Sequence, residues 1–223
     1  MNEITSTLVQ LAGGLRFTLG IFFLTLLFSI PLGLIVARGR MSKNKIVAAL
    51  VHIYISIMRG TPLMLQLLLV YFGPYYIFGV KLGDLDIGPF KYRFVATVIG
   101  FSLNYAAYFA EIFRGGIQSM PVGQYEAAQI LGFSRAQTFF RIILPQVIKR
   151  VLPSVTNEVI TLVMDTSLAQ VLAVTEMCTM AKNLASSQVS VMPFIAAGVF
   201  YYVMNGIIEI IMNRVEKKMR YYS

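Results

Sequence analysis

Polar and charged residues recur at helical spacing inside an otherwise apolar chain. The most regular series has separations of four, three and four residues, which place its members on one helical face: Ser154, Glu158, Thr161 and Asp165. Ionisable groups in an apolar environment are costly, so they normally pair with one another or face a polar cavity. The series therefore predicts the wall of a polar pathway, with chemistry suited to binding a polar solute.

Two shorter stripes accompany this series. One contains Asn104, Tyr108 and Glu111, with Ser102 nearby, and the other contains Arg59, Pro62 and Gln66. Three polar stripes in three apolar segments predict that the segments surround one interior pathway. The candidate substrate-binding residues are Gln66, Ser102, Asn104, Glu158, Thr161 and Asp165.

The alternative interpretation is that these groups satisfy each other structurally. Arg59 would then pair with Asp165, and Arg114 with Glu111. Glu158 stands apart because no cation occurs at a matching depth. An uncompensated carboxylate in a cavity of low dielectric constant favours a cationic ligand.

The sequence does not supply the residues that catalysis needs. His52 is the only histidine and Cys178 the only cysteine, and no Ser/His set, paired-Asp set or metal-ligand set occurs at workable spacing. The phosphate-binding pattern G-x-x-x-x-G-K-[ST] does not occur. We therefore expect no enzyme activity, no cofactor and no metal in this chain, and no basic-aromatic motif indicates nucleic acid.

The composition points to a membrane as the environment of these stripes. The 223 residues are 57% hydrophobic and only 13% charged, with mean hydropathy +0.71, whereas a soluble domain carries about 25% charged residues. A spanning helix needs about 20 mostly apolar residues. Five spans are predicted in a single all-α domain over 1–223: residues 17–37, 46–80, 94–114, 152–175 and 191–213. The second is interrupted by Arg59 and should bend at Pro62 and at Gly73-Pro74.

The basic residues predict how the spans are oriented. The formal net charge is +9, and Lys and Arg cluster between spans 1 and 2, between spans 3 and 4, and after span 5. The second loop (residues 81–93) is mixed in charge, and the fourth has only Glu176 and Lys182. The positive-inside rule then predicts an N-terminus outside and a C-terminus in the cytoplasm of a bacterial-type cell membrane.

The loop between spans 3 and 4, at about 115–150, carries the most specific motif. It reads E-A-A-x3-G-x9-I-x-L-P from Glu126 to Pro145. Pro121 can open a helix, Ser134 can cap a second one, Gly132 allows a turn and Pro145 would end the segment. This describes a short helix outside the bilayer that another protein can approach closely at two alanines.

This motif resembles the cytoplasmic loop of the membrane subunits of ATP-binding-cassette importers. Further segments are similar to the polar amino-acid uptake branch of that family: Arg59-Gly60-Thr61-Pro62-Leu63, Ala110-Glu111-Ile112, Gly123-Gln124 and Asp165-Thr166-Ser167-Leu168. Met164 occupies a position where that branch often has a lysine. The loss of this lysine and the presence of Glu158 favour arginine, lysine or histidine as substrate.

The resemblance implies a type I importer fold, with a coupling helix whose ATPase contacts are Glu126, Ala127, Ala128 and Gly132. It also implies a pair of ATPase subunits that bind ATP and Mg, an extracytoplasmic solute-binding protein, and a second permease subunit that is either identical or related. Two alternatives remain open. One is a permease for a neutral polar amino acid such as glutamine, and the other is a gradient-driven transporter or channel subunit in which the carboxylates form an ion path.

Overall fold

A computed structural model describes residues 3–80, 86–87 and 90–219 of the chain. The structure is almost entirely helical, which confirms the predicted all-α class. The helices are α1 (Glu3–Arg40), α2 (Lys45–Gly60), α3 (Leu63–Phe78), α4 (Tyr92–Gln118), α5 (Val122–Ile130), α6 (Arg135–Gln137), α7 (Leu144–Asp165), α8 (Met177–Gln188) and α9 (Met192–Met219). A π-helical segment η1 (Thr138–Ile143) precedes α7, and a 3-10 segment η2 (Thr166–Leu172) follows it. Strands β1 (Asp86–Ile87) and β2 (Phe90–Lys91) pair antiparallel; most of the predicted second loop lies outside the described residues.

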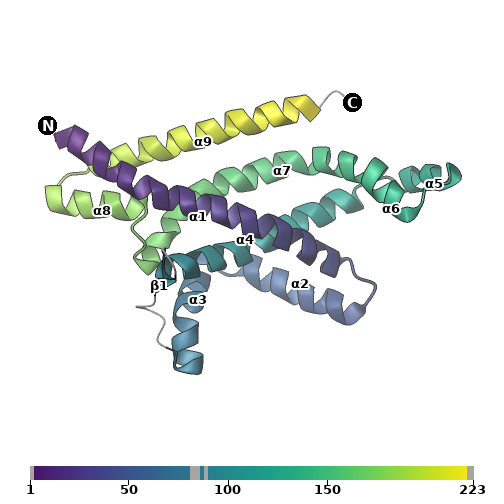
Figure 1. The fold of residues 1–223 in the computed structure, drawn as a ribbon, viewed down its shortest axis with the longest axis horizontal. Coiled ribbons are helices and arrows are strands. Elements are labelled where there is room, and N and C mark those ends of the chain that lie inside the picture. Colours follow the sequence, from purple (N-terminus) through teal and green to yellow (C-terminus); the bar gives the residue numbers. More distant parts are fainter. Residues whose placement is uncertain (1–2, 81–85, 88–89, 220–223) are drawn as a thin grey trace.

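Helix α4 is the centre of the molecule. It contacts α1, α2, α3 and α7. In Figure 1 the long α1 lies in front of α4 and crosses it. In the apolar stretch of α4 that is long enough to span a membrane, 67% is buried inside the protein, whereas in that of α9 only 6% is buried. Helix α9 therefore lies on the outside of the chain, where lipid or another subunit can cover it.

The structure reaches the predicted five spans only if each pair of helices joined by a bend is counted as one span. Among the described residues, three helices are long and apolar enough to cross a membrane, and two bent pairs bring the number to as many as five. Five spans thus remain a prediction. Helix α1 begins well before the predicted residue 17, because Arg16 does not interrupt it and instead places its guanidinium over the ring of Phe17 at 4.9 Å.

The predicted bend at Pro62 is confirmed. Helices α2 and α3 meet there at 112°. At Gly73-Pro74 no break occurs: α3 continues to Phe78 with Pro74 inside it, and a bend there stays a prediction. Pro74 has no N–H for the carbonyl of Val70, but the Tyr92 hydroxyl donates to that oxygen at 3.2 Å, so the helix continues without an unpaired group.

Two further boundaries differ from the prediction. Pro145 does not end the segment that carries the motif; it lies in the first turn of α7, after a π turn in which the Leu144 N–H donates to the Phe139 carbonyl. The π-type bond shifts the hydrogen-bonding ladder just where proline cannot contribute a donor. The fourth predicted span extends over α7 and η2, and then turns at Ala173, where φ is 52°.

Helix α8 occupies what the sequence predicts as an outer loop. It is capped by the fully buried Glu176, whose carboxylate accepts from the N–H groups of Cys178 at 2.6 Å and Thr179 at 2.7 Å. The Tyr201 hydroxyl of α9 also donates to it, at 3.1 Å. The carboxylate thus fixes α8 against α9 through hydrogen bonds alone, a role that charge counting does not reveal.

Candidate functional site

A cavity of about 200 Å³ lies where α4 and α7 face the α2–α3 bend. We call it the carboxylate cavity, and it is lined by Thr61, Leu63, Asn104, Tyr105, Tyr108, Glu158, Thr161 and Asp165. Four of the six predicted substrate-binding residues meet here: Asn104, Glu158, Thr161 and Asp165. Gln66 and Ser102 do not line the cavity. Its volume is below the roughly 300–1,000 Å³ of pockets for drug-sized ligands, so it suits a small solute.

The two carboxylates of the cavity have few partners. Asp165 accepts a hydrogen bond from the Tyr105 hydroxyl at 2.7 Å. Neither Asp165 nor Glu158 takes part in an ion pair among the described residues, whereas Glu111 pairs with both Arg59 and Arg114. Arg59 is near enough for its charge to act on Glu158, so a cation does occur near the depth of Glu158, contrary to the sequence-based expectation.

The predicted pairing of Arg59 with Asp165 is wrong. The Arg59 guanidinium lies 3.9 Å from the Glu111 carboxylate and 5.2 Å from the centre of the Tyr108 ring. Tyr108 and Glu111 are three residues apart on one face of α4, so they hold Arg59 together. The predicted pair of Arg114 with Glu111 is confirmed as a two-pronged contact, with N···O distances of 3.0 and 2.6 Å.

Gln66 and Asn104 stabilise the α2–α3 bend. Pro62 has no N–H to give to the carbonyl of Met58, and the side-chain amides of Gln66 and Asn104 each donate to that oxygen at 2.9 Å. Gln66 also donates to the Thr61 hydroxyl at 2.8 Å and accepts from Asn104 at 3.0 Å. We call Met58, Thr61, Gln66 and Asn104 the kink cluster. Asn104 belongs to both sites, because it also lines the carboxylate cavity. Its Oδ1 receives no hydrogen bond from the described residues and is available there.

Two other residues from which the substrate was predicted, Ser102 and Met164, lie away from the cavity. The Ser102 hydroxyl is buried without a hydrogen-bond partner among the described residues. Met164 is 49% exposed and does not line the carboxylate cavity. Within the single chain, the absence of a lysine at this position therefore does not change the charge of the cavity directly.

The segment predicted to contact an ATPase forms a separate short helix. Helix α5 begins after Pro121 and ends in a Schellman motif, in which the Gly132 N–H donates to the Gln129 carbonyl and the Phe133 N–H to the Ala128 carbonyl, both at 3.0 Å. Gly132 has φ of +77°, a conformation that favours glycine. Ser134 then caps α6 through a capping box with Gln137, so the predicted helix starts at Pro121 and Ser134 are both confirmed.

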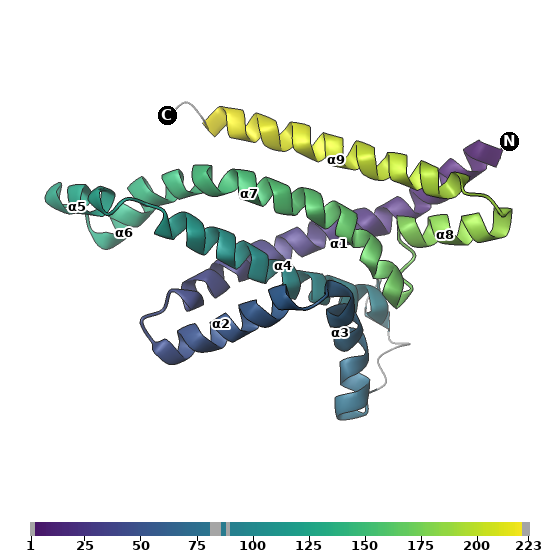
Figure 2. The ribbon, with the colours of Figure 1, turned by 180° about the vertical axis from the view of Figure 1, so that it is seen from behind.

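The surface of α5 is open. Of the four predicted contact residues only Ala128 is buried; Glu126, Ala127 and Gly132 are exposed. Exposed apolar side chains flank them, with Ile130 at 86% and Leu131 at 73%. Helices α5 and α6 project from one end of the molecule, away from α8 (Figures 1 and 2). An exposed apolar surface of this kind is typical of protein contacts.

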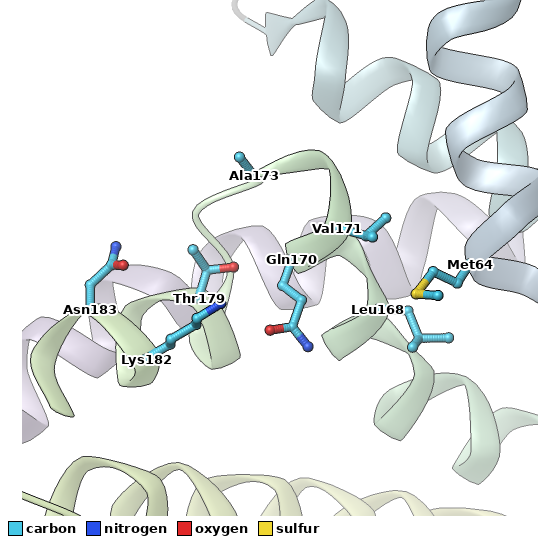
Figure 3. Close-up of a pocket in the computed structure, with 8 residues that line it drawn as sticks. All are labelled: Met64, Leu168, Gln170, Val171, Ala173, Thr179, Lys182 and Asn183. Atoms are coloured by element: carbon cyan, nitrogen blue, oxygen red, sulfur yellow. The ribbon is translucent and has the colours of Figure 1, made fainter. Parts of the chain in front are cut away.

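A second cavity, of about 430 Å³, lies near the opposite end of the molecule, between α3, η2 and α8. In Figure 3, Met64 and Leu168 lie at one side of it and Lys182 and Asn183 at the other, with Gln170 between them. None of the predicted site residues lines this cavity. Its residues were missed because α8 was not predicted.

Comparison with known proteins places these features in a family. Residues 29–221 match the family model "Binding-protein-dependent transport system inner membrane component". The chain is 38% identical over 200 residues to the nopaline transport system permease protein NocM of Agrobacterium fabrum, covering 89% of this chain and 83% of the relative. It is 34% identical over 214 residues to the L-cystine transport system permease protein TcyB of Bacillus subtilis, covering 95% and 87%.

A solved structure is similar over nearly the whole length. It is described as the crystal structure of an amino acid ABC transporter with histidines. Its matching chain has a TM-score of 0.84 and 31% identity, with 98% of this chain and 99% of that chain covered. The shared fold therefore includes the elements that form the carboxylate cavity and α5.

Proposed function

This chain belongs to the binding-protein-dependent transport system inner membrane components, and we propose that it carries amino acids with a cationic side chain. It is a multi-pass permease of an amino-acid ABC importer and not an enzyme; ATP hydrolysis belongs to a separate subunit. The gradient-driven alternative is set aside by this membership.

The carboxylate cavity carries the substrate proposal. Glu158 and Asp165 place two carboxylates in a small cavity without an ion-pair partner. A cationic side chain would supply that partner with charge-assisted hydrogen bonds. Asn104 and Thr161 would then hold the α-amino and α-carboxylate groups that all amino acids share, while Gln66 would act on the site only through its bond to Asn104.

Uptake of arginine and of glutamine into proteoliposomes, powered by ATP, tests this proposal. Glu158→Gln should weaken arginine handling by about 1–3 kcal/mol, the scale of a hydrogen bond to a charged group, and should affect glutamine less. Glu209→Gln is the matched control, because Glu209 is exposed on α9. Equal losses for both substrates, or no loss for either, would make Glu158 a structural residue.

A neutral polar amino acid such as glutamine is the second candidate substrate. The charge of Arg59 acts on Glu158 and reduces the need for a cationic ligand. This second candidate would be supported if the wild-type protein took up glutamine in preference to arginine and the Arg59→Gln variant lost that preference.

We assign coupling with the ATPase pair, which would bind the ATP and Mg, to Glu126, Ala127, Ala128 and Gly132. Gly132→Trp should abolish substrate-stimulated ATP hydrolysis while membrane insertion is retained, because a bulky residue is strained at φ of +77°. Gly132→Asn is the control, since asparagine tolerates this conformation and should preserve coupling. Full transport by the Trp variant would contradict the assignment.

The proposed topology places α5 and the C-terminus in the cytoplasm and the N-terminus outside. Basic residues end both α1 (Arg38, Arg40) and α9 (Lys217, Lys218), and these ends lie toward α5 (Figure 1). In a variant without Cys178, a cysteine at Ser134 should resist impermeant thiol reagents in intact cells; labelling there would reverse the orientation. The solute-binding protein would then meet the end that carries α8, and a second permease subunit would complete the pathway.

A further inference from the structure

A third cavity, distinct from the carboxylate cavity and from α5, lies between the start of α7 and the end of α9. It is an open groove of about 1010 Å³. Its walls contain Arg141, Ile142, Leu144, Pro145, Gln146, Ile148, Lys149, Arg150, Lys218 and Met219. In both ribbon views the last turns of α9 run alongside the first half of α7 (Figures 1 and 2).

The polar part of the groove is strongly basic. Four of its lining residues are cations and none is an acid. Arg141 and Lys218 have no hydrogen-bond or ion-pair partner within the described part of the chain, whereas Arg150 donates to the Ser119 carbonyl at 2.5 Å. Glu216 lies on the same end of α9 and has a partner of its own. At least two cations are thus available to an anionic ligand.

The groove continues into an apolar surface. On α9, Ile207, Ile211 and Val215 precede Lys218 at spacings of four, four and three residues, so they lie on the same helical face. Their exposed fractions are 53%, 52% and 40%. A basic recess at the end of an exposed apolar stripe matches a ligand with an anionic head and an apolar tail, and it matches free phosphate less well.

We propose that this groove binds an anionic phospholipid, with its phosphate on Arg141 and Lys218 and an acyl chain along the exposed stripe of α9. Basic pockets between membrane helices on the cytoplasmic side are suited to anionic headgroups, and aliphatic side chains exposed to lipid supply the complementary apolar surface. The site lies outside the translocation pathway and adds lipid recognition to the transport function.

The test measures lipid binding to the purified complex of permease and ATPase in detergent, with phosphatidylglycerol or phosphatidylcholine added in parallel. Wild-type protein should retain phosphatidylglycerol in preference to phosphatidylcholine, as counted by native mass spectrometry. Arg141→Gln combined with Lys218→Gln should reduce phosphatidylglycerol affinity by roughly tenfold to thirtyfold, because each basic side chain near an anionic surface contributes to binding.

Two control variants separate the groove from general charge and from misfolding. Arg38→Gln with Lys45→Gln removes the same charge from exposed positions outside the groove and should leave binding unchanged. Arg141→Lys with Lys218→Arg keeps the charge and should keep most of the affinity. Equal losses in the groove and control variants would overturn the proposal.

Competition identifies the source of the phosphate. Inorganic phosphate at the same concentration as the lipid should not displace phosphatidylglycerol; displacement would mean that the groove recognises phosphate alone, and the lipid assignment would be wrong. Binding to the isolated permease but not to the complex would show that the ATPase covers the groove, which would also overturn the proposal.

Discussion

The kink cluster and the carboxylate cavity are neighbouring polar sites in the same apolar bundle, and they differ in how completely their hydrogen bonds are satisfied. In the kink cluster, the amides of Gln66 and Asn104 replace the backbone donor that Pro62 lacks. In the carboxylate cavity, Glu158 and Asp165 have no ion-pair partner within the described residues. A polar group that completes the backbone of a membrane helix is structural, whereas one left open toward a cavity is available to a ligand.

The largest expected effect comes from breaking the satisfied site. Gln66→Leu removes donors from Met58 and Thr61 and an acceptor from Asn104. The Met58 carbonyl keeps its bond from Asn104, so the variant should cost about 1–3 kcal/mol in total, the range for a buried polar group left unpaired. Loss of folded protein in detergent on heating measures this. Gln170→Leu, at an exposed position on η2, is the control.

The same variant distinguishes the two roles considered for Gln66. If Gln66 contacted substrate directly, the variant would keep its stability and lose uptake. We expect the opposite result: stability should fall, and the preference between arginine and glutamine should be unchanged in the protein that remains folded.

A smaller effect is expected at the open site. Thr161→Val removes an exposed hydroxyl of the carboxylate cavity and should lower the uptake of arginine and glutamine alike, by about 1 kcal/mol for one hydrogen bond. Thermal stability should not change. Thr156→Val is the control because Thr156 donates to the Leu152 carbonyl and lies outside the cavity; a destabilised Thr161 variant would assign that residue to the structural site instead.

The smallest effect is expected at a second proline, Pro74, where a side-chain donor again replaces the backbone N–H that proline lacks. Tyr92→Phe leaves the Val70 carbonyl without the hydroxyl that compensates for Pro74, and should destabilise by about 0.5–1.5 kcal/mol without changing transport. The bond is single and long, so the loss should be below that of Gln66→Leu. Tyr76→Phe, at a tyrosine that is 78% exposed, should have no effect.

The sequence by itself determined the features that depend on local chemistry. Long apolar runs predict α1, α4 and α9, since hydropathy alone decides whether a helix can be covered by lipid. Pro62, Pro121, Ser134 and Gly132 predict local breaks, caps and turns because their backbone preferences act within a few residues. The motif from Glu126 to Pro145 identified the family that the comparisons show.

Only the tertiary structure decided which polar side chains are available to a substrate. Glu111 rather than Asp165 holds Arg59, and Gln66 bonds to Met58 rather than lining the cavity. Pro74 does not interrupt α3, and the Val70 carbonyl that it leaves without a backbone donor is paired by Tyr92 from another helix. In each case the partner is distant in sequence or lies across a bend, so the hydrogen bond depends on how the helices pack, and spacing along one helix cannot reveal it.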